Sequence, residues 1–159
     1  MKRLHRSIDR RSERGAAVLE FGLIAPLLFM VIFGLIQYGY QFWSLTTASA
    51  TAREAARRMI VGQDWDSCVL PTLQGHAQQP AVGSDAVEAS YRYTDDAGQA
   101  LTRPARVGDL VVVTVRFQSL HMGLPFLPVP DDGRVSQSAT ARVENVPATP
   151  PPCEGPGNP

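Results

Sequence analysis

The chain has 159 residues, enough for one modest domain and a membrane anchor. Its 15 basic and 15 acidic residues give a formal net charge of zero, but six of the basic residues and only two of the acidic ones fall within residues 1–14. The remainder is mildly acidic, which argues against a nucleic-acid-binding surface, so no nucleic acid is expected as a partner.

An apolar run over residues 16–36 directly follows this basic segment. No charged residue occurs between Phe21 and Ala52, and the run has about the ~20 residues that cross a hydrocarbon layer of roughly 30 Å. A buried helix of a soluble domain is the alternative, but a chain of this size has little protein to cover a helix that is apolar on every side. We therefore predict a transmembrane helix in contact with membrane lipid. The dense basic cluster before it predicts a cytoplasmic N-terminus.

Glu20 lies about one helical turn inside the apolar run, where a carboxylate is costly to bury. It is either an acid tolerated near the lipid boundary or a charge that meets a partner. Gly15 suggests such a partner, because cleavage after it gives Ala16 a new α-ammonium group. Residues four apart share a helix face, and opposite charges attract strongly in a low-dielectric setting. The pair forms either within one chain or between neighbouring subunits, where it sets the register of assembly.

These residues carry a family resemblance. The stretch "RGAAVLEF" (Arg14–Phe21) resembles the cleavage site of type IV pilin-like precursors, with a basic leader ending in glycine, four residues, a glutamate and an aromatic residue. Two further stretches, "EFGLIAPLL" (Glu20–Leu28) and "AREAAR" (Ala52–Arg57), are similar to the TadE-like family of pseudopilins, which is encoded with tight-adherence (Flp pilus) secretion systems. The resemblance extends from Arg14 to Gly62.

The resemblance implies that residues 1–15 are a leader, removed by a membrane-embedded prepilin peptidase that cuts between Gly15 and Ala16. Glu20 and Phe21 are then the assembly and register residues. It implies a minor pseudopilin or assembly subunit whose partners are other pilins or pseudopilins and the inner-membrane assembly platform. The location implied is the bacterial inner membrane with a periplasmic C-terminal domain, either staying there or entering the pilus. The alternative is a single-pass envelope protein with an uncleaved anchor and a small adaptor or sensor domain.

The helical pattern continues beyond the apolar run, so residues 16–62 are predicted to form one long helix that Gly62 ends. Pro26 lies inside the span, either as a local loosening or as an ordinary membrane proline. An aromatic belt typical of the membrane–water boundary consists of Tyr38, Tyr40, Phe42 and Trp43.

Small residues recur every four positions along the outer part of this helix. They are Ser44, Ala48, Ala52 and Ala56. Such a ridge permits close helix approach, either to the chain's own sheet or to another subunit. Beside the ridge, Glu54 is placed to pair with Arg57 or Arg58.

Residues 63–145 are predicted to form an extracytoplasmic, β-rich domain. Its first part, Gln63–Ser84, is interpreted as a loop with a short helical turn near Asp66–Leu70. Alternating apolar residues then predict three strands, at Ala86–Tyr93, Asp109–Phe117 and Arg134–Asn145. Short connections favour an antiparallel sheet, whose apolar face the outer half of the long helix can cover. The predicted fold is α+β and pilin-like, with the membrane-spanning part in the first half of the helix.

A proline-rich loop follows the second predicted strand, with Leu124, Phe126 and Leu127 as exposed apolar candidates. It either binds a partner or caps the edge of the sheet. The tail, residues 146–159, is proline-rich and has too little apolar content to pack. A disulfide between Cys68 and Cys153 is predicted, because both cysteines lie beyond the span, in an oxidising compartment, and a bridge would restrain this tail.

No catalytic or metal-binding pattern stands out in the sequence. There is no G-x-S-x-G, no HExxH and no phosphate-binding loop, and the three histidines are scattered over different segments. The two cysteines have neither the number nor the spacing of a structural zinc site. We therefore expect no catalytic residues, no metal and no cofactor.

Overall fold

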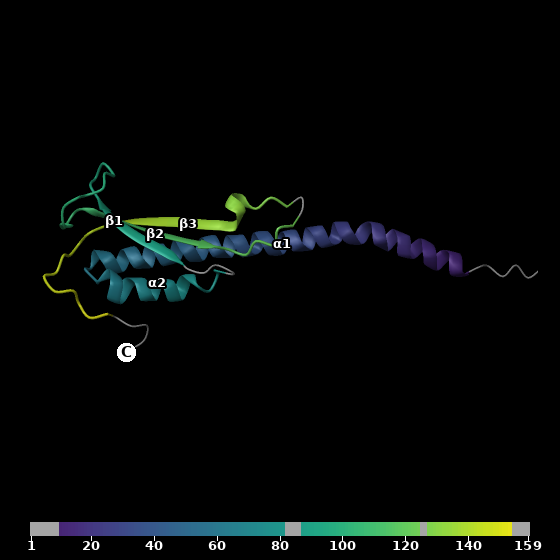
Figure 1. Cartoon of the computed structure of the whole chain (residues 1–159), viewed down its shortest axis with the longest axis horizontal. Helices are drawn as coiled ribbons and strands as arrows, with labels where there is room; N and C mark the ends of the chain where they lie inside the picture. The colour runs from purple at the N-terminus through teal and green to yellow at the C-terminus, as the bar shows by residue number, and fades with distance from the viewer. Residues whose placement is uncertain (1–9, 82–86, 125–126, 154–159) are drawn as a thin grey trace, which may run out of the picture. The chain divides into compact units, whose positions relative to one another are not determined.

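The computed structural model describes residues 10–81, 87–124 and 127–153 (Figure 1). The chain divides into two compact units, Met1–Ile36 and Gln37–Pro159. Residues 1–9 of the predicted leader and residues 154–159 of the predicted tail lie outside the described residues. The elements in chain order are α1 (Arg10–Ile60), a π-helical turn (Trp65–Val69), α2 (Leu70–Ala77), β1 (Glu88–Thr94), β2 (Leu110–Gln118), a 3-10 turn (Pro130–Gly133) and β3 (Arg134–Arg142).

The second unit contains a three-stranded antiparallel sheet in the order β1-β2-β3. Strand β2 alternates strictly, so that its odd-numbered residues from Val111 to Phe117 are buried on one face. In the register, Val113 lies between Tyr91 of β1 and Ala139 of β3. The three predicted strands are confirmed, with strand ends that differ from the prediction by up to three residues; the predicted start of the first strand, Ala86, lies outside the described residues. The inner faces are less regular than that of β2, since Tyr91 of β1 is 42% exposed.

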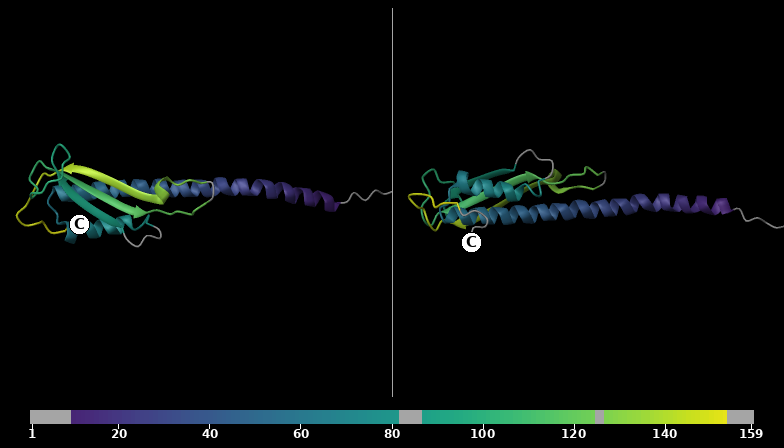
Figure 2. Two further views of the ribbon diagram at one scale, coloured as in Figure 1. Left: turned by 45° about the horizontal axis from the view of Figure 1, so that its top comes forward. Right: turned by 90° about the horizontal axis from the view of Figure 1, so that it is seen from below.

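Helical residues cover the buried face of this sheet (Figures 1 and 2). The core cluster joins β2 to Val135 and Val143, to Leu73 and Ala77 of α2, and to the part of α1 that belongs to the second unit. This α1 part contributes Ala48, Ala52, Ala55, Ala56 and Met59. Small side chains on the helix let the two layers approach closely while the sheet supplies the larger valines. The predicted α+β fold, a long apolar N-terminal helix packed on a small antiparallel sheet, is therefore confirmed.

The helical turn expected near Asp66–Leu70 is present as the π-helical turn Trp65–Val69, but the prediction of a loop is wrong for Leu70–Ala77, which form α2. The carboxylate of Asp64 caps the π-helical turn by accepting the backbone N–H of Ser67 at 2.9 Å. Val69, Leu73 and Ala77 recur every four residues and are all buried. Helix α2 has only two turns, so its apolar repeat is short, and the Pro71 and Gly75 within it indicated a loop instead.

A disulfide links Cys68 of the π-helical turn to Cys153 of the tail, with an S–S distance of 1.95 Å. This is the pairing expected from the sequence. The two residues are 85 positions apart, so the bond encloses all three strands in one covalent ring. It also attaches the otherwise extended tail to the helical layer, which restricts the conformations open to the unfolded chain.

The connection between β1 and β2 is held by an ion pair at its end. Arg103 donates to both carboxylate oxygens of Asp109, at 2.7 and 2.8 Å, and the Arg106 backbone N–H donates to the same carboxylate at 2.8 Å. These bonds, with that from Arg103 the largest cause, lower the pKa of Asp109 to about 2. Asp109 directly precedes β2, so this connection and the loop that follows Gln118 lie at opposite ends of the strand.

Gly62, in the turn that follows α1, is a glycine that no other residue replaces easily. Gly62 has a φ of +87°, and its N–H donates to the Met59 carbonyl at 3.1 Å. A Cβ at this position would overlap the ring of Pro147. We expect Gly62→Ala to lower the free energy of unfolding by about 1–3 kcal/mol, from left-handed strain and this clash.

The matched control is Gly75→Ala in α2, where an added Cβ meets no atom within 4 Å. Alanine favours a helix over glycine, so this variant should be as stable as the parent or more stable, by up to ~1 kcal/mol. Urea unfolding followed by tryptophan fluorescence compares the two. Equal stability of the Gly62→Ala variant and the parent would contradict the steric argument.

Candidate processing and assembly site

The first unit presents its large apolar side chains at the surface. Val18, Leu19, Phe21, Leu23 and Leu35 have exposed fractions of 68–83%. Within the part of the chain that the structure describes, α1 is the one helix long and apolar enough to cross a membrane, judged by length and composition, with a mean hydropathy of 2.4 in its most apolar stretch. Apolar surface of this extent needs lipid or protein to cover it, which supports membrane association.

Gly15 and Ala16, the predicted cleavage residues, both lie inside α1 and are exposed. The helix begins at Arg10, six residues before its predicted start at Ala16. A Cβ built on Gly15 meets no described atom within 4 Å. Both positions therefore lie on the open surface of the helix, and a larger residue at position 15 is compatible with the helix.

Glu20 follows Ala16 by one turn on the same face of α1 and is exposed. It forms no ion pair with any of the described residues that follow Arg14. Phe21, the next residue in the chain, is 68% exposed. A carboxylate among exposed apolar side chains is costly to place in lipid unless an opposite charge compensates it.

The structure places the small-residue ridge in the interior of the second unit. Ser44, Ala48, Ala52 and Ala56 have exposed fractions of 0–2%, and the three alanines belong to the core cluster that includes the buried residues of the sheet. Of the two alternatives for this ridge, packing on the chain's own sheet is the one that the structure supports. Ser44 donates its hydroxyl to the Tyr40 carbonyl at 2.9 Å, so Ser119 must donate in the 2.7 Å bond between the two serine hydroxyls.

Gln37 is a site residue that the sequence analysis missed. Its side chain is 1% exposed, and its amide nitrogen donates to the Leu120 carbonyl at 2.5 Å. Its amide oxygen accepts the Met122 backbone N–H at 3.1 Å. No local signal in the sequence marks this role, because its two partners lie 83 and 85 positions away along the chain.

The predicted aromatic belt also binds the chain's own loops. The Tyr38 hydroxyl donates to the Pro128 carbonyl at 2.5 Å, and the Tyr40 hydroxyl donates to the Pro80 carbonyl at 3.2 Å. Leu124 and Leu127 of the proline-rich loop are half-buried, whereas Phe126 lies outside the described residues. Gln37, Tyr38 and Ser44, with their partners at residues 119–128, are called the loop latch below.

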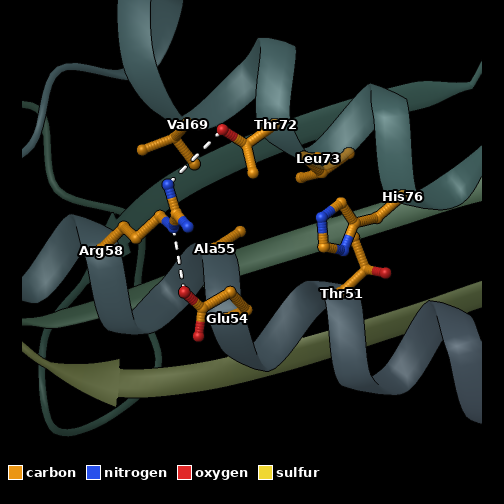
Figure 3. Close-up of a pocket in the computed structure, with 8 residues that line it drawn as sticks. All are labelled: Thr51, Glu54, Ala55, Arg58, Val69, Thr72, Leu73 and His76. Carbon is orange, nitrogen blue, oxygen red and sulfur yellow. Dashed lines mark hydrogen bonds and ion pairs between the residues drawn. The ribbon is translucent and has the colours of Figure 1, made fainter. Parts of the chain in front are cut away.

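A small cavity between α1 and α2 has a volume of about 10 Å³, space for about one water molecule (Figure 3). Arg58 crosses it, donating to Glu54 at 3.0 Å and to Thr72 at 3.4 Å. The Glu54–Arg58 ion pair is thus one of the two pairings allowed by the sequence. His76 lines the cavity across from Thr51, and the arrangement is that of a helix–helix joint.

The comparison with protein families supplies one match. The model of the TadE-like protein family matches residues 15–57, beginning at Gly15. No curated protein and no solved structure matches the chain. The resemblance noted in the sequence is therefore confirmed for residues 15–57, and this TadE-like segment supports a membrane protein associated with the tight-adherence pilus.

Proposed function

We propose that the chain is a minor pseudopilin or assembly subunit of a tight-adherence (Flp type IVb) pilus, and that a prepilin peptidase cuts it after Gly15. The observation that carries the proposal is the TadE-like match, which begins at Gly15 and includes the whole apolar part of α1. The exposure of Gly15 and Ala16 supports access of a peptidase to the bond between them.

Cleavage changes the charges around Glu20 in two ways. Hydrolysis leaves a carboxylate on Gly15 and an α-ammonium on Ala16, which is protonated at neutral pH because such amines have a pKa near ~8. It also moves the start of the helix from Arg10 to Ala16, so that the positive end of the helix dipole lies one turn from Glu20. Both changes stabilise the Glu20 carboxylate at the lipid boundary.

Pairing between subunits gives this charge an assembly role. An ammonium group on Ala16 of one subunit and Glu20 of its neighbour lower each other's desolvation penalty when both leave water. Only one longitudinal offset of the two helices brings the groups together, so the pair selects the register. The partners proposed are prepilin peptidase, other pilins or pseudopilins and the assembly platform of the bacterial inner membrane.

The proposed subunit is a substrate and a building element without catalytic activity of its own. Its basic N-terminal segment lies in the cytoplasm, and the second unit lies in the periplasm, in agreement with a disulfide at Cys68 and Cys153. The subunit either stays in the inner membrane or enters the pilus.

N-terminal sequencing of the membrane-bound protein tests the proposal directly. We expect the mature chain to begin at Ala16, with a size smaller than the translated chain by the 15-residue leader. The competing role, a single-pass envelope protein with an uncleaved anchor, predicts that the chain still begins at Met1. A mature protein that retains its arginine-rich leader would remove the basis for the pilus role.

A further inference from the structure

The loop between β2 and β3 is unusually apolar for a surface connection. Residues 119–130 contain no Asp, Glu, Lys or Arg. In its described parts, Leu120, Met122, Leu124, Leu127 and Val129 are half-buried, and Pro128 and Pro130 are exposed. Charged residues flank it, with Arg116 three residues before its start and Asp131 and Asp132 directly after its end. A surface segment with this composition is typical of a binding surface for an apolar partner.

The loop latch fixes this segment against one short stretch of α1. Leu120 and Met122 bind the side chain of Gln37, and Pro128 binds the hydroxyl of Tyr38. Both ends of the loop are therefore tied to two consecutive helix residues. Figure 1 shows the chain directly after β2 running beside α1, where Leu120 and Met122 bind Gln37.

The position of Gln37 and Tyr38 along the helix identifies the partner. Gln37 directly follows Ile36, the last residue of the apolar run, and the 21 residues from Ala16 to Ile36 have a helical length of roughly 31 Å. This is about the thickness of the hydrocarbon layer, so Gln37 and Tyr38 fall where that layer ends and the headgroups begin. Tyr38 and Trp43 have exposed fractions of 38% and 45%, and such rings favour this depth.

We propose that the loop, through residues 120–124 and 127–130, lies in the lipid interface as a second membrane contact of the periplasmic domain. The partner is bilayer lipid. An uncharged segment with exposed prolines suits the boundary of headgroups and acyl chains, and the latch holds it at the depth of that boundary. The proposal rests on the membrane span of the proposed function but not on cleavage or on pilus assembly.

The test uses the full chain, with its disulfide intact, reconstituted into vesicles of phosphatidylethanolamine and phosphatidylglycerol. The environment-sensitive dye NBD is attached to one added cysteine, in the variants Leu124→Cys and His121→Cys. His121 is an exposed polar position of the same loop, so its label reports on the loop independently of an apolar side chain. The control is Ala97→Cys, an exposed position in the connection at the opposite end of β2.

We expect both loop labels to show a blue-shifted emission and to lose intensity when the vesicles contain lipid with a quencher near the headgroup. The Ala97 label should be quenched by aqueous iodide alone. Loop labels that iodide quenches as strongly as the Ala97 label would overturn the proposal. Labels shielded from both quenchers would also overturn it, since protein, such as a second copy of the chain, would then cover the loop.

Flotation of the same vesicles separates this inference from the span on which it rests. If the protein does not float with lipid, the span itself is wrong. If it floats and the loop labels behave like the Ala97 label, the span stands and the loop contact is wrong. Replacing Gln37 by alanine in the Leu124→Cys chain should reduce quenching by the lipid-borne group, because the loop loses two of its bonds to α1.

Discussion

A Gly15→Leu variant is expected to accumulate in the membrane as the uncleaved precursor, with almost no mature form. A peptidase site that closes over a glycine backbone has no space for a branched four-carbon side chain. The substitution should not disturb the chain itself, because a Cβ at Gly15 meets no described atom within 4 Å and leucine is a good helix former. The size of the protein in membranes, with N-terminal sequencing of each form, measures the effect.

Gly22→Leu is the matched control for this variant. It places the same side chain seven residues later on α1, where an added Cβ also meets no described atom within 4 Å. This chain should mature normally. Normal maturation of the Gly15→Leu variant, or equal loss of processing in both variants, would show that Gly15 does not define the cleavage site.

A Glu20→Ala variant is expected to be cleaved like the parent but to fail in assembly. Glu20 is exposed and makes no ion pair with the described residues that follow Arg14, so its loss leaves the subunit fold intact. Removing one partner of a desolvated pair costs about 3–5 kcal/mol, because the Ala16 ammonium then stays uncompensated. At 1.36 kcal/mol per tenfold change, each subunit contact weakens by about 10²- to 10⁴-fold.

Two further substitutions separate charge from shape at this position. Glu20→Gln keeps the length of the side chain without its charge and should fail as Glu20→Ala does. Glu20→Asp keeps the charge on a shorter side chain and should retain part of the assembly. The measurement is the amount of pilus protein sheared from cells, with N-terminal sequencing as the record of processing. Undiminished piliation in the Glu20→Ala variant would remove the proposed register role.

Much of the fold was predictable because its signals are local and repeated. Strand β2 alternates four buried residues with polar or half-buried ones, and a period of two has no helical interpretation. The ridge from Ser44 to Ala56 repeats every four residues, and the same spacing that permits close approach places all its members in the core. The cleavage and register residues stay predictions, drawn from the order of charge, glycine and apolar residues together with the resemblance to the TadE-like family.

Other features were not predictable because they depend on contacts between distant segments. Gln37 and Met122 are 85 positions apart, and nothing local to either residue marks the hydrogen bond between them. The sequence also left open whether the ridge packs on the chain's own sheet or on another subunit, because that choice depends on where the sheet lies. Helix α2 was missed for a different reason: the repeat from Val69 to Ala77 is short, and no side chain caps the start of the helix.

The ring closed by Cys68 and Cys153 decides which parts of the domain carry mechanical load. A pull on the chain beyond Cys153 passes through the sulfur bridge to Cys68 and from there, over the few residues that follow Ile60, into α1. The hydrogen bonds of β1, β2 and β3 lie off this path, because all three strands belong to the bypassed part of the ring. Tension between a tethered tail and an anchored helix would therefore be carried by covalent bonds and would not load the hydrogen bonds of the sheet.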